Sequence, residues 1–75
     1  AVAYGSSEVR DAVDFGAAET VIITDSRLRN GSAAKTVEDA ERLNAAVVVL
    51  STEFEPGKRL EGLGGIAALL RYKIG

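Results

Sequence analysis

The segment Thr20-Val21-Ile22-Ile23-Thr24 determines the expected fold, and Ala46-Val47-Val48-Val49-Leu50 has the same character further along the chain. Both segments are continuous, apolar and rich in β-branched residues, which is typical of strands. Neither alternates between apolar and polar residues, so we expect both faces of each strand to be covered, as in a parallel sheet between helices. Ile23 and Val48 are then central, and truncating either to alanine is expected to cost about 2–4 kcal/mol.

Helices are predicted before both strands. Ser6 or Ser7 is expected to cap a helix that stops at Gly16. Thr36 is expected to cap a second helix, with Asp39 in the position of a capping-box partner. This alternation of helices and strands is typical of α/β folds.

A third, short helix is predicted after the second strand. Pro56 suits the first position of a helix, where its missing N–H would have no intrahelical partner in any case. Leu60 and Leu63 are expected to face inward, and the glycines within residues 62–65 are expected to end the helix.

The last segment, Ile66–Tyr72, is ambiguous from its pattern. Its alanines and leucines favour a helix, whereas the glycines before it favour a strand. Val2–Tyr4 is expected to add a short edge strand. With a strand at the end, the order β-α-β-α-β-α-β predicts a three-layer α/β/α sandwich around a mostly parallel or mixed sheet. Asp25–Lys35 is then the longest stretch without predicted structure.

The composition limits the functions that fit this chain. With 75 residues, it is expected to form one domain, residues 1–75. It contains no cysteine or histidine, so it has no thiolate nucleophile and lacks the commonest metal ligand and general base. The net charge of −2 disfavours broad electrostatic binding to nucleic acid. We therefore expect no enzyme, metal site or cofactor, and no membrane partner because no apolar run approaches the ~20 residues that span a bilayer.

Carboxylates are plentiful, but their positions favour a solvated polar face over paired acid–base catalysis. Glu38 lies four residues before Arg42, the better orientation for an ion pair on a helix, and Asp11 lies next to Arg10. The acidic residues considered are Asp11, Asp14, Glu38, Asp39, Glu41, Glu53, Glu55 and Glu61.

The segment Gly62-Leu63-Gly64-Gly65-Ile66-Ala67 matches the G-x-G-x-x-A pattern of dinucleotide-binding proteins. That pattern works when the glycines follow a strand and open a helix, so that pyrophosphate approaches the helix N-terminus. Here a predicted helix precedes the glycines. A helix stop and a tight turn therefore explain them better than a nucleotide site.

Two segments are candidate contacts for other proteins. The long loop Asp25–Lys35 carries cations and an Asn-Gly turn signal, and Thr52–Arg59 alternates in charge around an aromatic residue. A solvated connector and an ordinary polar turn are the respective alternatives. The candidate protein-interaction residues are Arg27, Leu28, Arg29, Phe54, Glu55 and Arg59.

Several phrases in the chain together resemble a known family. Gly64–Tyr72 reads GGIAALLRY, and it follows Tyr4-Gly5, Ser51–Glu53 and Gly57–Leu60 in the order found in the C-terminal domain of Pelota and of archaeal and eukaryotic class-1 release factors. The similarity covers nearly the whole chain, and the middle segments look more like archaeal Pelota. The resemblance favours a strand for Ile66–Tyr72 and implies the α/β/α fold shared with kink-turn-binding ribosomal proteins.

The resemblance also implies a function. Pelota-like factors rescue and recycle stalled ribosomes in mRNA surveillance, and their C-terminal domain docks proteins. The implied partners are a GTPase of the elongation factor 1-alpha type, an ABC-type ribosome recycling ATPase and, through the whole factor, the stalled ribosome. The implied location is the cytoplasm. The C-terminal domain of an archaeal class-1 release factor remains an alternative.

A kink-turn RNA-binding module is a second alternative, because it shares the fold. The RNA binders open their first helix with Gly-Thr-Asn-Glu and carry a lysine downstream. Gly5 and Glu8 match that phrase, whereas Ser7 replaces the asparagine and Asp11 replaces the lysine. Because a carboxylate repels phosphate, we expect no direct binding of nucleic acid.

Overall fold

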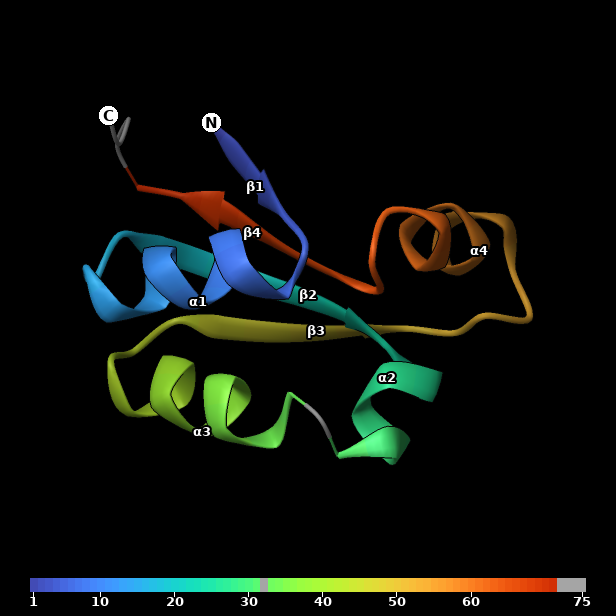
Figure 1. Cartoon of the computed structure of the whole chain (residues 1–75), viewed down its shortest axis with the longest axis horizontal. Coiled ribbons are helices and arrows are strands. Elements are labelled where there is room, and N and C mark those ends of the chain that lie inside the picture. Colours follow the sequence, from blue (N-terminus) through green and yellow to red (C-terminus); the bar gives the residue numbers. More distant parts are fainter. Residues whose placement is uncertain (32, 72–75) are drawn as a thin grey trace.

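The computed structural model describes residues 1–31 and 33–71. Its elements follow in the order β1 (Val2–Tyr4), α1 (Ser6–Asp14), β2 (Ala18–Thr24), α2 (Asp25–Asn30), α3 (Ala34–Arg42), β3 (Ala46–Leu50), α4 (Glu55–Gly62) and β4 (Ile66–Leu70) (Figure 1). No helix in the described ranges is long and apolar enough to cross a membrane.

The four strands form one mixed sheet in the order β1-β4-β2-β3. β2 and β3 are parallel, while β4 lies between β1 and β2 and is antiparallel to both. This confirms the α/β fold class, the short edge strand Val2–Tyr4 and a strand at the last segment. The predicted end of that segment, Tyr72, lies outside the described residues.

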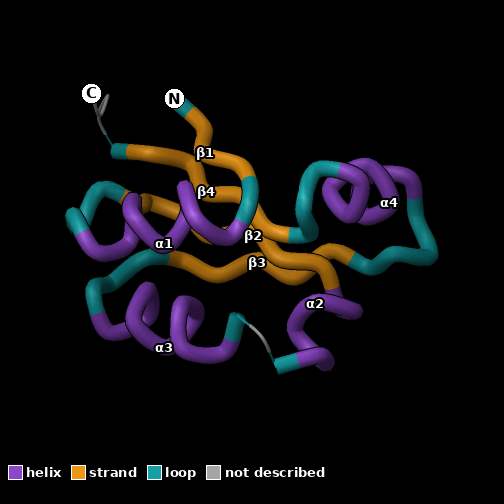
Figure 2. The backbone as a smooth tube through the Cα atoms, viewed as in Figure 1, coloured by secondary structure: helices purple, strands orange, loops and turns teal. Residues whose placement is uncertain are grey.

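One face of the sheet carries the core. α1 and α3 pack beside each other and cover this face (Figure 2). Val21 and Ile23 of β2 and Ile66 of β4 point into the core and are fully buried, together with Val9 and Val13 of α1. Nine of the fifteen buried hydrophobic residues among those described are alanine, so the two helices lie close to the sheet.

The other face is only partly covered. α4 packs over one end of it, where Leu60 is buried, and Leu69 and Val48 elsewhere on this face are 37% and 42% exposed. The expectation that both faces of β3 are covered is therefore wrong, as is a central position for Val48. The β-branched run predicted the strand correctly, but β4 takes the place beside β2 and leaves β3 at the border of the sheet.

Three predicted helix boundaries differ in the structure. α1 starts at Ser6 after Gly5, which has a φ of 87° and needs no side-chain cap, so neither Ser6 nor Ser7 caps it. α3 begins at Ala34, two residues before the predicted cap Thr36, because alanine extends the helix backwards. α4 ends at Gly62, so Leu63 follows the helix and is 52% exposed rather than inward-facing.

A fourth helix, α2, lies within the predicted loop Asp25–Lys35. The side chain of Thr24 caps it by accepting from the N–H of Arg27 at 3.3 Å. Gly31 closes it in the left-handed conformation with a φ of 81°. Both signals are present in the sequence.

Asp39 lies in the interface between α1 and α3 and not on a solvated face. Its side chain is 5% exposed, and its Oδ2 accepts from Arg10 of α1 at 2.6 Å. Lys35 and Arg42 bind its Oδ1 from within α3, so the predicted pair of Glu38 with Arg42 is replaced by one with Asp39. The Arg10 hydrogen bond is the main reason that the pKa of Asp39 lies below its ordinary value. This carboxylate joins the two core helices.

Candidate docking surface

The two predicted contact segments lie at the same end of the sheet. Because β2 and β3 are parallel, their carboxyl ends meet at one edge, where open α/β sheets commonly bind ligands. α2 follows β2 directly, and residues 51–54 and α4 follow β3 (Figure 1). We call α2 together with residues 51–62 the strand-end surface.

Asp25 connects the two halves of the strand-end surface. Its Oδ1 accepts from the backbone N–H of Thr52 at 3.1 Å and from the Thr52 hydroxyl at 3.0 Å. The same oxygen accepts from the N–H of Ser26 at 2.8 Å. The bonds from Thr52 lower the pKa of Asp25, because they favour the ionised carboxylate. The start of α2 is thereby fixed to the segment that leads into α4.

Glu61 makes a second connection, from the last turn of α4. Its Oε1 accepts from the hydroxyl of Thr24 at 2.8 Å, and its Oε2 accepts from the hydroxyl of Ser26 at 2.6 Å. These bonds, that of Ser26 first, lower the pKa of Glu61. Although Glu61 was predicted to belong to a solvated face, its carboxylate holds α4 against the junction of β2 and α2.

The Gly64-Gly65 pair permits close backbone approach behind this surface. Both residues have positive φ angles, 109° and 79°. A Cβ on Gly64 would lie 3.2 Å from the Cα of Gly5, and one on Gly65 would lie 3.4 Å from both the Cβ and the Cδ of Arg27. The glycines lie between α4 and β4, hence after a helix and before a strand, as predicted. These glycines allow the backbone and Arg27 to pack closely. In a dinucleotide-binding fingerprint the glycines instead follow a strand and precede a helix.

Arg27 has an unsatisfied group at this surface. Its Nε is buried and has no hydrogen-bond partner among the described residues. A cavity of about 330 Å³ lies beside it, lined by Ser26, Arg27, Asn30, Glu61 and Gly64. Both oxygens of Glu61 in the wall of this cavity accept from hydroxyl groups of Thr24 and Ser26.

The other candidate residues are well exposed. Leu28 and Phe54 are 40% and 65% exposed. Arg29 lies 4.0 Å from Asp25 and Arg59 lies 3.6 Å from Glu55, and these ion pairs are too exposed to hold the cations firmly.

The structure brings the six candidates to one end of the molecule but does not place them in one cluster. Arg27, Leu28 and Arg29 belong to α2. Phe54 is the N-cap of α4, and Glu55 and Arg59 lie in the first and last turns of that helix. The connecting residues Asp25, Thr52 and Glu61 were not predicted. The strand-end position of Thr24-Asp25-Ser26 is a usable signal for a helix start, whereas nothing near Glu61 in the sequence points to its hydroxyl partners.

Stability is expected to fall as the pH is lowered from about 5 to about 2, because Asp25, Asp39 and Glu61 all have lowered pKa values in the folded chain. The sign follows from the lower folded pKa. The stabilisation is complete above the ordinary values of about 4 and is lost as the pH falls through the native values. Urea unfolding midpoints measured across this pH range give the change in stability. The Glu61→Gln variant should show a shallower pH dependence, and an equal slope would contradict the assignment for Glu61.

Comparison with known proteins gives a consistent result over the whole chain. The family model for eRF1 domain 3 matches residues 1–74. A protein pelota homolog from Methanocorpusculum labreanum is 69% identical over 74 residues, covering 99% of this chain and 22% of that protein. The chain thus spans about a fifth of the length of this relative.

Solved structures agree in fold. Archaeoglobus fulgidus Pelota superimposes with a TM-score of 0.87 at 45% identity, over 96% of this chain and 24% of that one. Archaeal Pelota from a ribosome-bound assembly with ABCE1 superimposes with a TM-score of 0.88 at 39% identity. The match covers 99% of this chain and 22% of that one. Saccharomyces cerevisiae Dom34 superimposes with a TM-score of 0.84 at 29% identity, over 97% of this chain and 22% of that one. Dom34 is a termination-like factor described as interacting with Hbs1.

Proposed function

Because the chain belongs to the eRF1 domain 3 family, we propose that residues 1–75 form the C-terminal, protein-docking domain of a Pelota-type factor in the rescue and recycling of stalled ribosomes. The observation that carries this proposal is the 69% identity to an archaeal Pelota homologue across 99% of the chain. That identity favours Pelota over a class-1 release factor. A factor of this kind acts in the cytoplasm, where ribosomes translate.

The proposed partners follow from the structural relatives. One relative is archaeal Pelota on the ribosome with ABCE1, and another is Dom34, which interacts with Hbs1. By analogy, this chain would bind an ABC-type ribosome recycling ATPase and a GTPase of the elongation factor 1-alpha type. The stalled ribosome would be reached through the whole factor.

We propose that the strand-end surface supplies contacts to these partners. Its exposed cations are held only weakly, its apolar residues Leu28 and Phe54 are exposed, and Arg27 lines a cavity of about 330 Å³. Exposed arginine and aromatic residues are enriched at protein interfaces. Asp25 and Glu61 hold both halves of the surface in place, so little ordering would be required on binding.

Charge reversal in the variant Arg29→Glu/Arg59→Glu is expected to weaken binding of the ATPase or the GTPase by about threefold to tenfold, because each exposed cation contributes modestly. Its unfolding free energy should change by less than about 0.5 kcal/mol, since neither side chain is buried. Calorimetric titration of the chain with each protein measures the binding, and thermal unfolding checks the fold.

The matched control is Arg29→Lys/Arg59→Lys, which keeps both charges at the same positions. It should bind within about twofold of the parent chain. Loss of binding in the control, or unchanged affinity of the reversed variant for both proteins, would reject the strand-end surface as the charged contact.

A further inference from the structure

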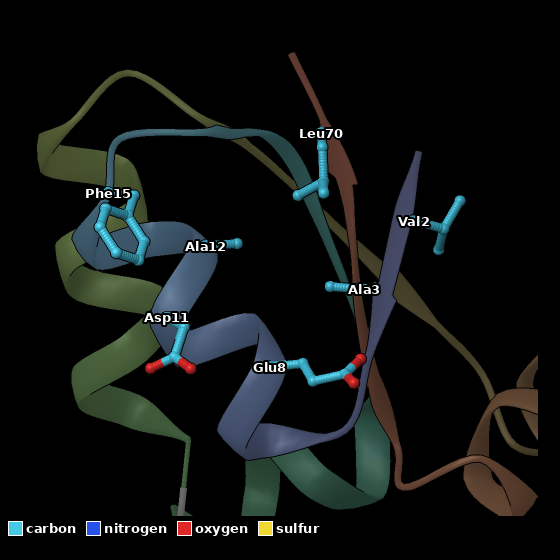
Figure 3. Close-up of a pocket in the computed structure, with 7 residues that line it drawn as sticks. All are labelled: Val2, Ala3, Glu8, Asp11, Ala12, Phe15 and Leu70. Atoms are coloured by element: carbon cyan, nitrogen blue, oxygen red, sulfur yellow. The ribbon is translucent and has the colours of Figure 1, made fainter. Parts of the chain in front are cut away.

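A second hollow lies away from the strand-end surface, between the edge strand β1 and helix α1 (Figure 3). Its volume is about 300 Å³, and we call it the edge groove. Its apolar lining consists of Val2, Ala3, Ala12, Phe15 and Leu70, of which Ala3 and Ala12 are almost completely buried. Figure 3 shows the side chains of Ala3, Ala12 and Leu70 in the space between α1 and the sheet. Small side chains on both walls leave room for an aliphatic segment from another molecule.

Two carboxylates border the edge groove. Glu8 and Asp11 lie three residues apart on α1, which places them on neighbouring turns of one helix face. Both are exposed, and no cation of the described residues lies within ion-pair distance of either. The nearby Arg10 is engaged elsewhere, because Asp14 and Asp39 each bind it at 2.6 Å. Within residues 1–31 and 33–71, the negative border of the edge groove therefore has no ion-pair partner.

Glu8 is held in place at the edge of the sheet. Its Oε2 accepts from the backbone N–H of Tyr4 at 3.2 Å, and Figure 3 shows the side chain reaching from α1 towards β1. β1 pairs with β4 on one side only, so this bond occupies an outward N–H of the edge strand. The addition of a foreign strand at Tyr4 is thereby discouraged. A side chain, not an extended backbone, is the group that fits the edge groove.

We propose that the edge groove receives a basic side chain from a protein partner of this chain. The aliphatic stem of a lysine or arginine would lie against Phe15 and Leu70, and its charged head would meet Glu8 and Asp11. The two carboxylates exclude a phosphate backbone from the same place, which separates this occupant from RNA. The inference rests on the proposed docking function and adds to it a second surface, of opposite charge preference.

The test uses neutral, isosteric substitutions. Glu8→Gln/Asp11→Asn removes both charges but retains an acceptor for the N–H of Tyr4. Glu38→Gln/Glu41→Gln makes the same charge change on the exposed side of α3 and is the matched control. Each chain, labelled for NMR, is titrated with the peptide acetyl-Leu-Arg-Leu-Arg-amide, and its dissociation constants for the ATPase and the GTPase are measured separately.

The expected result has two parts. The peptide should shift amide signals around Ala3, Glu8 and Ala12 in the parent chain and in the control, but not in Glu8→Gln/Asp11→Asn. The same variant should bind one of the two proteins about threefold to tenfold more weakly, with the difference shrinking at high salt. The control should stay within about twofold of the parent chain.

The two proposals can fail separately. If the parent chain binds a partner and Glu8→Gln/Asp11→Asn binds it equally well, the edge groove is not a partner site, while the docking function stands. Peptide shifts outside the groove, or shifts that persist in the variant, also overturn the edge-groove proposal. If neither protein binds the parent chain but the peptide occupies the groove, the proposed partners are wrong and the groove remains a site for basic side chains.

Discussion

Replacing Gly57 with alanine is expected to destabilise the chain by about 3 kcal/mol or more, the largest effect that we expect of a single methyl group here. A Cβ at this position would lie 1.9 Å from the carbonyl oxygen of Ser51 and 2.5 Å from its carbonyl carbon. Both atoms belong to the backbone, so no side chain can rotate to relieve the clash. α4 would have to move away from the end of β3, which would separate Glu61 from Thr24 and Ser26.

Gly62 provides the control for this experiment. It lies in the same helix and a Cβ there would meet no atom within 4 Å, so Gly62→Ala should be neutral or stabilising by up to about 1 kcal/mol. Urea unfolding followed by circular dichroism measures both variants. Similar stabilities for the two would mean that α4 does not lie against Ser51 as described.

Truncating Ile23 to alanine is expected to cost about 2–4 kcal/mol. Its side chain is fully buried on the face that α1 and α3 cover, and removing three carbons would leave a cavity in a core made largely of alanine. In a domain of this size such a loss can exceed the total stability, so the measurement belongs at low temperature with added stabilising salt.

Val48 provides the comparison within the same sheet. It pairs with Ile22 on the open face of the edge strand and is 42% exposed, so Val48→Ala should cost less than about 1 kcal/mol. The sequence patterns of the two strands are nearly alike, but Ile23 lies on the covered face of a central strand and Val48 on the open face of an edge strand. Equal losses for Ile23→Ala and Val48→Ala would indicate that β3 is covered by something in solution.

The contrast between these two residues shows what the sequence can predict about the fold. Composition predicted β2 and β3, because β-branched runs bounded by turns are a local signal. For β4, which is rich in alanine and leucine, the pattern was ambiguous and the family resemblance favoured a strand. Which strand is central depends on the long-range pairing of β2 with β4, and no local pattern encodes it. Helix starts were predicted less well, since Gly5 begins α1 through its backbone conformation and needs no capping hydroxyl.

The same distinction between local and long-range information applies to the residues of the candidate surface. Exposed residues such as Arg29 and Phe54 were predicted from charge and loop length, which are properties of a short segment. Glu61 and Asp39 were assigned to a solvated face because their hydroxyl and guanidinium partners come from distant elements. Carboxylates that connect elements can be distinguished from solvated ones only once the packing is known.

The alanine-rich core also constrains how this chain can diverge. Alanine, the smallest apolar side chain that has a Cβ, occupies nine of the fifteen buried hydrophobic positions in the part of the chain that the structure describes. Almost every conservative apolar exchange there therefore adds volume between closely packed layers. Accepted changes inside would have to arise as compensating pairs, one side chain growing as its neighbour shrinks. Single substitutions would therefore accumulate mainly at exposed positions, so the preference for a binding partner can change while the fold stays almost the same.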